Sequence, residues 1–187
     1  FANVTFLNIG EQDLENVNYN KIIQSMNENN IKDNEYDYAI VNASLHHSSK
    51  PHYSILEMYR VAKKGVLIVE GNDSLTIRLS AEFGIAEKFE KSAIENGQGG
   101  VDNSEIPNFI YRWTEREILK LINSYKPELI HKIIFDYGYD LGNVLKKKNF
   151  VRKIIEIIFK VYFNIFKKQQ NLLSIFIDKQ NSKKRNF

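Results

Sequence analysis

The chain has 187 residues, of which 43% are hydrophobic and 26% are charged, with a net charge of +3. This composition is sufficient for one domain with a real core and argues against disorder. The chain contains no cysteine, which excludes a disulfide framework, a thiolate nucleophile and a cysteine zinc site, and favours a cytoplasmic protein.

The first 35 residues predict one strand and one helix. Residues 4–9 form a short apolar run that is typical of a strand, and Ile22, Ile23 and Met26 recur at helical spacing within residues 19–26. Asn and Asp residues then end this helix. No basic segment is followed by an apolar core, so no signal peptide is predicted, and a first residue other than Met indicates a fragment or a trimmed chain.

Residues 36–71, YDYAIVNASLHHSSKPHYSILEMYRVAKKGVLIVEG, predict a strand, a helix and a second strand. The apolar runs 38–41 and 66–69 suit strands that are buried on both faces. Pro51 suits the first turn of the helix, and Gly65 suits its left-handed stop. The apolar face of this helix consists of Ile55, Met58, Tyr59 and Ala62. Such a unit predicts a right-handed parallel crossover.

The second half of the chain predicts helices that alternate with strands around one long loop. Residues 74–88 have a helical pattern, and residues 92–108 are rich in Gly, Asn, Asp and Ser, which predicts a lid or binding loop. Thr114 and Glu117 form a capping box that begins another helix. Two further strands are predicted over residues 129–135 and 172–177.

The positive charge is concentrated in residues 143–168, which hold eight Lys and Arg side chains against one Glu, a net charge of +7. The polar side chains of this segment form one narrow helical stripe, and the rest of its surface is apolar. Charges interrupt it too often for a spanning helix. Two interpretations remain: the helix packs on the sheet or a partner, which is favoured, or it lies on an anionic membrane surface. No nucleic-acid motif is present, and nucleic acid is not an expected partner.

The block at residues 36–71 resembles the central part of class I S-adenosylmethionine-dependent methyltransferases, especially the small-molecule group called type 11. The shared features are a strand that ends in Asn, a Leu-His-His segment, a helix that ends in Tyr-Arg-Val, and a Gly turn before the next strand. Residues 3–16, 111–125 and 171–179 are similar to the family's third strand with its acidic loop, the helix before strand six, and the last strand. The resemblance implies an α/β fold with a Rossmann-like sheet.

The resemblance also implies that the sheet is incomplete at the N-terminus. The family's Gly-rich loop after strand one and its acidic residue after strand two have no counterpart and would precede Phe1. Residues 1–187 are therefore expected to form a partial methyltransferase domain without the first two strands, about 60 residues in two crossover units. The strand at residues 4–9 would then lack a hydrogen-bonding neighbour, strand four would have an unpaired edge, and the chain alone would bind cofactor poorly.

The expected cofactor is S-adenosylmethionine, because the resemblance implies it. Gly10, Glu11, Gln12 and Asp13 occupy the adenine end, where Glu11 and Asp13 compete to accept the adenine amino group. In open α/β sheets ligands bind beyond the carboxyl ends of strands. The segment that follows residues 38–41 lies at such an end, and the resemblance places its backbone along the methionine side of the cofactor: Asn42, Ala43 and Ser44.

His46 and His47 are the candidate catalytic residues. The resemblance implies that one of them faces the methyl group or the acceptor, where an imidazole with a pKa near 6.5 could remove the acceptor's proton. The alternative, which is favoured, is that one histidine packs under the following helix and the other is solvated. A metal site at His46, His47 and His52 is not expected, because adjacent histidines diverge and no spaced ligand pair completes a set.

Two other groups of residues have structural interpretations that are favoured over functional ones. Three glycines in the long loop could suggest a phosphate cradle, but a flexible lid fits better: Gly97, Gly99 and Gly100. Three residues before the capping box could face an acceptor, but they more simply cover the sheet edge: Tyr111, Arg112 and Trp113.

The sequence therefore predicts transfer of a methyl group from S-adenosylmethionine to a small-molecule acceptor, as O- or N-methylation. The alternative is a non-catalytic module, derived from a methyltransferase, that binds a partner or the membrane periphery through residues 143–168.

Overall fold

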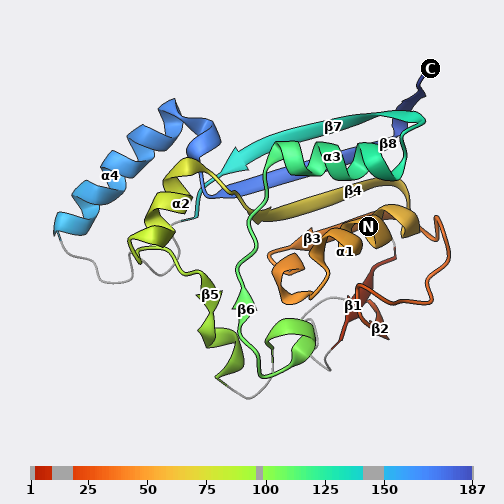
Figure 1. Cartoon of the computed structure of the whole chain (residues 1–187), viewed down its shortest axis with the longest axis horizontal. Coiled ribbons are helices and arrows are strands. Elements are labelled where there is room, and N and C mark those ends of the chain that lie inside the picture. The colour runs from red at the N-terminus through yellow and green to blue at the C-terminus, as the bar shows by residue number, and fades with distance from the viewer. Residues whose placement is uncertain (1–2, 10–18, 96–98, 141–149, 187) are drawn as a thin grey trace.

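The computed structural model describes residues 3–9, 19–95, 99–140 and 150–186. Its centre is a four-stranded sheet in the order β3–β4–β8–β7 (Figure 1). β3 (Tyr36–Asn42) and β4 (Ala62–Gly71) are parallel, and β8 (Leu172–Lys184) is antiparallel to both β4 and β7 (Leu129–Gly138). The predicted α/β sheet with its parallel crossover is therefore present.

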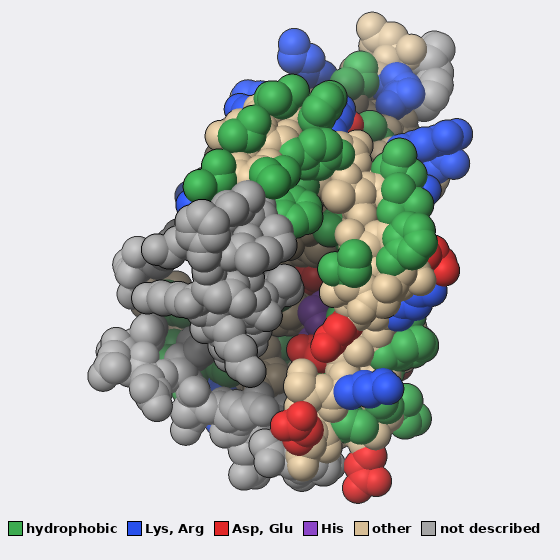
Figure 2. Space-filling model, turned by 90° about the vertical axis from the view of Figure 1, so that its left-hand side faces the viewer, with side chains coloured by type: hydrophobic (Ala, Val, Ile, Leu, Met, Phe, Trp, Pro, Cys, Tyr) green, Lys and Arg blue, Asp and Glu red, His purple; other side chains and the backbone are tan. Residues whose placement is uncertain are grey.

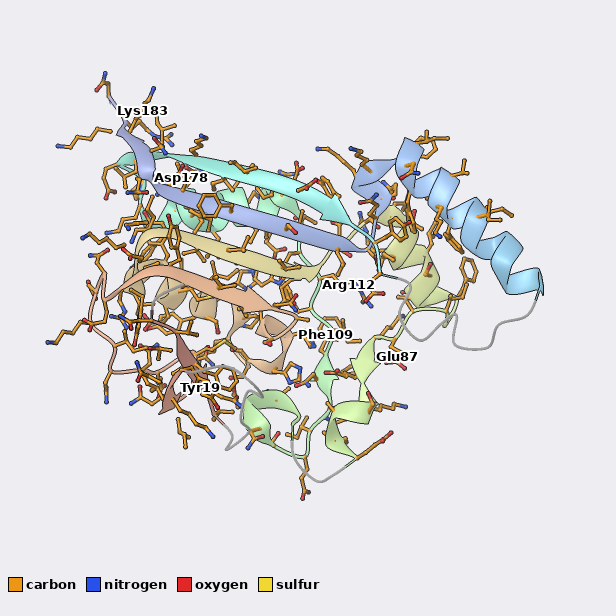
Figure 3. The ribbon with its side chains drawn as sticks, turned by 180° about the vertical axis from the view of Figure 1, so that it is seen from behind. Tyr19, Glu87, Phe109, Arg112, Asp178 and Lys183 are labelled. Carbon is orange, nitrogen blue, oxygen red and sulfur yellow. The ribbon has the colours of Figure 1, made fainter. Side chains whose placement is uncertain are left out.

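Two helices cover the same face of this sheet. α1 (Pro51–Val61) contacts β3 and β4, and α3 (Glu115–Tyr125) contacts β7 and α1. Seen from behind, the opposite face of the sheet lies in front of these helices (Figure 3). The core lies between the helices and the sheet and includes Val41, Ile55, Val66, Ile68, Trp113, Ile118, Ile122, Leu173, Ile175 and Ile177.

The connection between α1 and β4 differs from the predicted glycine stop. α1 begins with Pro51 in its first turn, as predicted, but it ends at Val61, and Ala62 is already extended. The ammonium of Lys179 donates to the carbonyls of Tyr59 and Ala62 and so satisfies two backbone acceptors at the end of the helix. Gly65 lies within β4, where a Cβ would stand 2.8 Å from the Phe176 ring. Close packing of strands, rather than a left-handed turn, requires this glycine.

The N-terminal strands form a small sheet of their own, which corrects two predictions. β1 (Thr5–Asn8) pairs in parallel with β2 (Asn20–Ile23), so residues 19–26 are not a helix and the first strand does have a partner. Three apolar residues at helical spacing are too few to outweigh this pairing. Among the described residues β3 is an edge of the larger sheet, as predicted. The absence of two further strands stays a prediction.

The segment between β4 and α3 has more structure than predicted. α2 (Leu75–Glu82) has Ser74 as its N-cap and ends six residues short of the predicted 74–88. The predicted loop 92–108 overlaps η2 (Lys91–Ile94), η3 (Val101–Asn103) and β6 (Asn108–Phe109). β6 pairs with β5 (Phe89–Glu90), and Arg112 donates to the Glu87 carbonyl over 2.8 Å (Figure 3).

The remaining predicted elements are present with longer bounds. Thr114 Oγ1 accepts a hydrogen bond from the Glu117 amide and begins α3, as predicted. The strands predicted over residues 129–135 and 172–177 correspond to β7 and β8.

The predicted basic helix corresponds to α4 (Phe150–Ile165), which precedes η5 (Lys167–Gln169). Residues 143–149 of the prediction lie outside the described residues. Phe163 is buried, whereas five other apolar side chains of α4 are exposed: Ile157, Ile158, Phe159, Val161 and Ile165. Figure 2 shows hydrophobic side chains gathered on this side of the molecule. In the described part of the chain no helix is long and apolar enough to cross a membrane.

Candidate functional site

The turn after β3 is held by a buried carboxylate. Ala43 has a left-handed backbone (φ +46°), and η1 (Leu45–His47) follows it directly. Glu70, on β4 and 1% exposed, accepts hydrogen bonds at Oε1 from the amides of Ser44 (2.7 Å) and Leu45 (2.8 Å). A charged acceptor makes stronger hydrogen bonds than a neutral one, so Glu70 fixes the path of this turn.

His46 and His47 leave this turn toward a second carboxylate. Nδ1 of His46 lies 3.4 Å from Glu70 Oε2, and its Nε2 lies 3.4 Å from Glu90 Oε2. His47 Nε2 lies 3.3 Å from the same Glu90 oxygen. Burial lowers the pKa of His46, but the hydrogen bond and charge of Glu70, with a contribution from Glu90, outweigh it and raise that pKa overall. Neither histidine is merely solvated.

The segment predicted as a lid lies against His47. The Gly99 carbonyl lies 3.0 Å from His47 Nδ1, and Asp102 accepts from the Ser49 amide over 3.2 Å. The amide nitrogen of Asn108 donates to Gly99 O and Glu90 Oε2, each over 3.1 Å. Gly97 lies outside the described residues. These contacts join the predicted lid directly to the histidine pair.

A cavity of about 260 Å³ opens beside this turn. It is lined by the ends of β1 and β2, by η1 and by the segment that holds Gly99, and its polar lining includes Asn8, Gln24, Ser44, His47 and Ser48. Of the residues predicted for the methionine side, Ser44 lines the cavity, whereas Asn42 and Ala43 are exposed beside it. Gly10, Glu11, Gln12 and Asp13 lie outside the described residues.

The cavity fits part of the predicted cofactor. The carboxyl end of β1 and the turn after β3 meet at it, which is where open α/β sheets bind nucleotide-like ligands. Ligand pockets usually span about 300–1,000 Å³, so the described residues enclose less than a whole site. Small side chains at the turn leave room for a ligand here.

A second histidine contact lies away from this cluster. His52 Nε2 is 2.9 Å from Glu117 Oε1, and the Tyr111 hydroxyl donates to the same carboxylate oxygen. Burial, followed by that hydrogen bond, raises the pKa of Tyr111. Trp113 is fully buried in the core, as the structural interpretation of this group predicts. His52 therefore joins α1 to α3 and does not converge with His46 and His47.

Sequence reasoning missed Glu70, Glu90 and Asn108. Glu70 had a signal, because an acidic residue at the end of an otherwise apolar strand requires a partner. Glu90 and Asn108 had none, because they reach the histidines only through the pairing of β5 with β6.

Residues 1–69 match the family described as a methyltransferase domain. No curated protein matches the chain. Among solved structures, a methyltransferase from Haloferax volcanii in complex with the Trm112 methyltransferase activator has 10% identity and a TM-score of 0.53. The match covers 94% of this chain and 71% of that protein.

Two other solved structures have the same fold, and both are S-adenosylmethionine-dependent methyltransferases. The protein from Methanosarcina mazei is 14% identical with a TM-score of 0.51, and the match covers 94% of this chain and 80% of that one. The protein from Archaeoglobus fulgidus has the same identity and TM-score, with 94% and 75% covered. These structures confirm the fold that the resemblance at residues 36–71 implies.

Proposed function

We propose that this chain, which has the fold of class I S-adenosylmethionine-dependent methyltransferases and matches a methyltransferase domain over residues 1–69, methylates a small molecule on oxygen or nitrogen. The observation that supports this is the turn after β3. It carries Ser44 and both histidines, it is fixed by Glu70, and it borders a cavity at the carboxyl edge of the strands. A buried anchor of this kind preorganises a site.

The residues divide the site into a cofactor side and an acceptor side. S-adenosylmethionine, when bound, supplies a methyl group on a sulfonium that leaves as a neutral thioether. Ser44 and the cavity would hold its methionine end, and His46 and His47 would face the acceptor. The acceptor would take that methyl group, and His46 and His47 would stand on the side where the acceptor's proton leaves. Alignment supplies much of the rate of such a transfer.

The predicted lid fits this division. Gly99 and Asp102 contact the turn directly, so residues 99–103 cover the acceptor side of the cavity. We propose that this segment excludes water from the reacting atoms and selects the acceptor by its shape.

Binding of S-adenosylhomocysteine tests the proposal. Because the described residues enclose only part of the cofactor, we expect weak binding, which amide chemical shifts in a two-dimensional NMR titration detect and locate. The shifts should concentrate at Ser44, His47 and Gly99. Ser44→Trp fills the cavity and should abolish them, whereas Ser124→Trp, on the exposed side of α3, should not.

The same titration separates the enzyme from the alternative function. If saturating S-adenosylhomocysteine shifts no amide of the turn, or if Ser44→Trp shifts them as the unmodified chain does, the methyltransferase proposal fails. The chain would then be better described as a non-catalytic module.

We also propose that α4 contacts an anionic membrane surface. Ile157, Ile158, Val161 and Ile165 are each at least 55% exposed. Lys160 lies in α4 and Lys167 follows it in η5, whereas Lys168 pairs with Glu115. An amphipathic helix with Lys beside its apolar face binds at the lipid headgroups. This arrangement fits an anionic lipid surface better than a neutral one, and it suits an acceptor that is itself lipid-linked.

Vesicle sedimentation tests the membrane contact. The chain should sediment with vesicles that contain anionic phospholipid and remain in solution with purely zwitterionic vesicles. The double variant Ile158→Asp and Ile165→Asp should lower the bound fraction at least tenfold, and the matched control Leu119→Asp, on α3, should not. Equal sedimentation with both vesicle types, or no effect of the double variant, would contradict the proposal.

A further inference from the structure

Three side chains converge between η1 and β5. Nε2 of His46 and Nε2 of His47 lie 3.4 Å and 3.3 Å from the same oxygen of Glu90. One ligand atom of each of the three residues lies within 4.8 Å of those of the other two. Sequence reasoning rejected a metal here after comparing His46 and His47 with His52, and it did not include Glu90.

Both histidines are turned so that Nε2 carries the lone pair. His47 Nδ1 is 3.0 Å from both the Gly99 carbonyl oxygen and the Asn108 amide nitrogen. The carbonyl can only accept, and the two amide protons of Asn108 already have Gly99 O and Glu90 Oε2 as acceptors, so we assign the proton to Nδ1. His46 Nδ1 faces the buried carboxylate of Glu70 in the same way. Histidines that bind metals almost always donate their other ring N–H to a carboxylate or a backbone carbonyl. Here each histidine has one of these two partners.

With both rings neutral, the converging atoms are all acceptors. Two Nε2 lone pairs then face a carboxylate oxygen that accepts one hydrogen bond, from the Asn108 amide, and the lone pairs repel unless a cation stands between them. Two protonated rings would satisfy Glu90 but would place two cations side by side, since the ring centroids are 4.6 Å apart. One divalent ion satisfies all three groups at once.

The spacing suits a tetrahedral ion. Zn²⁺ binds nitrogen and oxygen at about 2.0–2.2 Å, which separates two ligand atoms of a tetrahedron by about 3.3–3.6 Å. The two Nε2 atoms lie at that separation from the Glu90 oxygen. His47 and Glu90 have side chains that are 35% and 31% exposed, so an ion can enter from solvent. Figure 2 shows a histidine beside acidic side chains in a recess of the surface.

We propose that His46, His47 and Glu90 bind one divalent transition-metal ion, with Zn²⁺ as the best fit, and that a fourth position stays open. Glu70, Gly99 and Asn108 hold these ligands in place. His47 also lines the cavity, so the ion lies at the acceptor side.

The role of the ion, unlike its binding, rests on the proposed function. A hydroxyl of the acceptor would bind at the open position, where the ion would lower the pKa of that hydroxyl. With both Nε2 atoms on the ion, the proton would pass to solvent instead of to a histidine. The resulting oxygen anion attacks the sulfonium methyl carbon, and the carbon–sulfur pair stays on sulfur. This selects acceptors with an oxygen nucleophile.

Metal titration of the untagged chain, after dialysis against a chelator, tests the site. Calorimetry with Zn²⁺ should give one ion per chain, and Co²⁺ should give the visible absorption of a four-coordinate site. Glu90→Gln and His47→Ala should each weaken Zn²⁺ binding at least tenfold. Glu70→Gln should weaken it about 10- to 100-fold, as loss of a partner to a metal-binding histidine does. The matched control His52→Ala, which removes the other histidine–glutamate contact, should bind Zn²⁺ as the unmodified chain does.

The outcomes distinguish this inference from the proposed function. Absence of Zn²⁺ binding, or unchanged binding by both Glu90→Gln and His47→Ala with unchanged circular dichroism, overturns the metal site. If the chain binds S-adenosylhomocysteine but not Zn²⁺, the methyltransferase proposal stands and the metal site is rejected. If it binds Zn²⁺ but not S-adenosylhomocysteine, the metal site stands and its role in methyl transfer is rejected.

Discussion

Histidine meets glutamate in two parts of this molecule, and the two contacts are built for different purposes. His52 and Glu117 join α1 to α3 through one direct bond of 2.9 Å, with side chains that are 43% and 27% exposed. His46 and His47 instead share Glu90 at longer distances, and their other ring nitrogens face Glu70 and Gly99.

The shorter contact, between His52 and Glu117, thus consists of a single pair of side chains. A single exposed pair gains little in water, because solvent screens it and side-chain entropy opposes it. In the cluster after β3, two histidine Nε2 atoms face one Glu90 oxygen, and its donor among the described residues is the Asn108 amide, an arrangement that a bound ion would stabilise. The convergence of several ionisable side chains on one point therefore indicates function better than one short contact does.

Replacing Glu70 should have the largest effect on stability. Glu70→Ala leaves the amides of Ser44 and Leu45 without their acceptor, and an unsatisfied buried donor costs about 1–3 kcal/mol. We expect the free energy of unfolding to fall by about 2–5 kcal/mol in urea denaturation. A loss below about 1 kcal/mol would mean that Glu70 does not hold the turn.

Replacing His52 should affect stability much less. His52→Ala removes an ion pair that is partly exposed, and such pairs contribute about 0.2–1 kcal/mol. Urea denaturation beside Glu70→Ala gives the contrast directly. If the two variants lose equal stability, the distinction between the anchored cluster and the exposed contact fails.

The backbone of the turn provides a third test, with the opposite sign. Ala43 adopts φ +46°, where a Cβ costs about 1–2 kcal/mol, so Ala43→Gly relieves strain. Glycine also raises the entropy of the unfolded chain, which offsets about 0.5–1 kcal/mol of this gain. We expect a net stabilisation of about 0.5 kcal/mol. Ala39→Gly, within β3, is the matched control and should destabilise the chain; a loss in both variants would contradict the strain argument.

The sequence predicted the helices that carry these contacts, but it did not predict that Glu90 meets the two histidines. α1 and α3 begin where Pro51 and the Thr114 cap indicate, because these signals act over one helical turn. His46 and His47 were named as candidate catalytic residues, and the structure brings both of them to Glu90, whereas their catalytic role stays a prediction. Glu90 could not be predicted, since it reaches His46 across 44 positions through a two-residue strand pair that carries no periodic signal.

The same distinction explains the N-terminal error. Residues 20–23 form a strand because β1 supplies their hydrogen bonds, although their apolar spacing alone favoured a helix. Tertiary pairing decides such short segments, and their sequence does not contain it.

His131 provides the baseline for both contacts, because it is a partly buried histidine whose hydrogen-bond partner is a hydroxyl. Its Nε2 lies 2.9 Å from the Tyr59 hydroxyl. Burial is the largest effect on its pKa and lowers it; the charge of Glu128 opposes this, and the charges of Arg185 and Lys179 lower the pKa further. A pKa below its unfolded value means that the unfolded chain binds the proton more tightly. The stability that neutral His131 contributes is therefore present above pH 6.5 and lost as the pH falls through the folded pKa.

We expect this to be the smallest effect of the four. The unfolding free energies of the chain and of His131→Gln should be compared at pH 7.5 and 5.5, so that titration of the other histidines cancels in the difference. The advantage of the unmodified chain should shrink at the lower pH. If the advantage grows on acidification, the folded state raises the pKa of His131, as the carboxylates raise that of His46. The contrast between a histidine beside a hydroxyl and one between two carboxylates would then be lost.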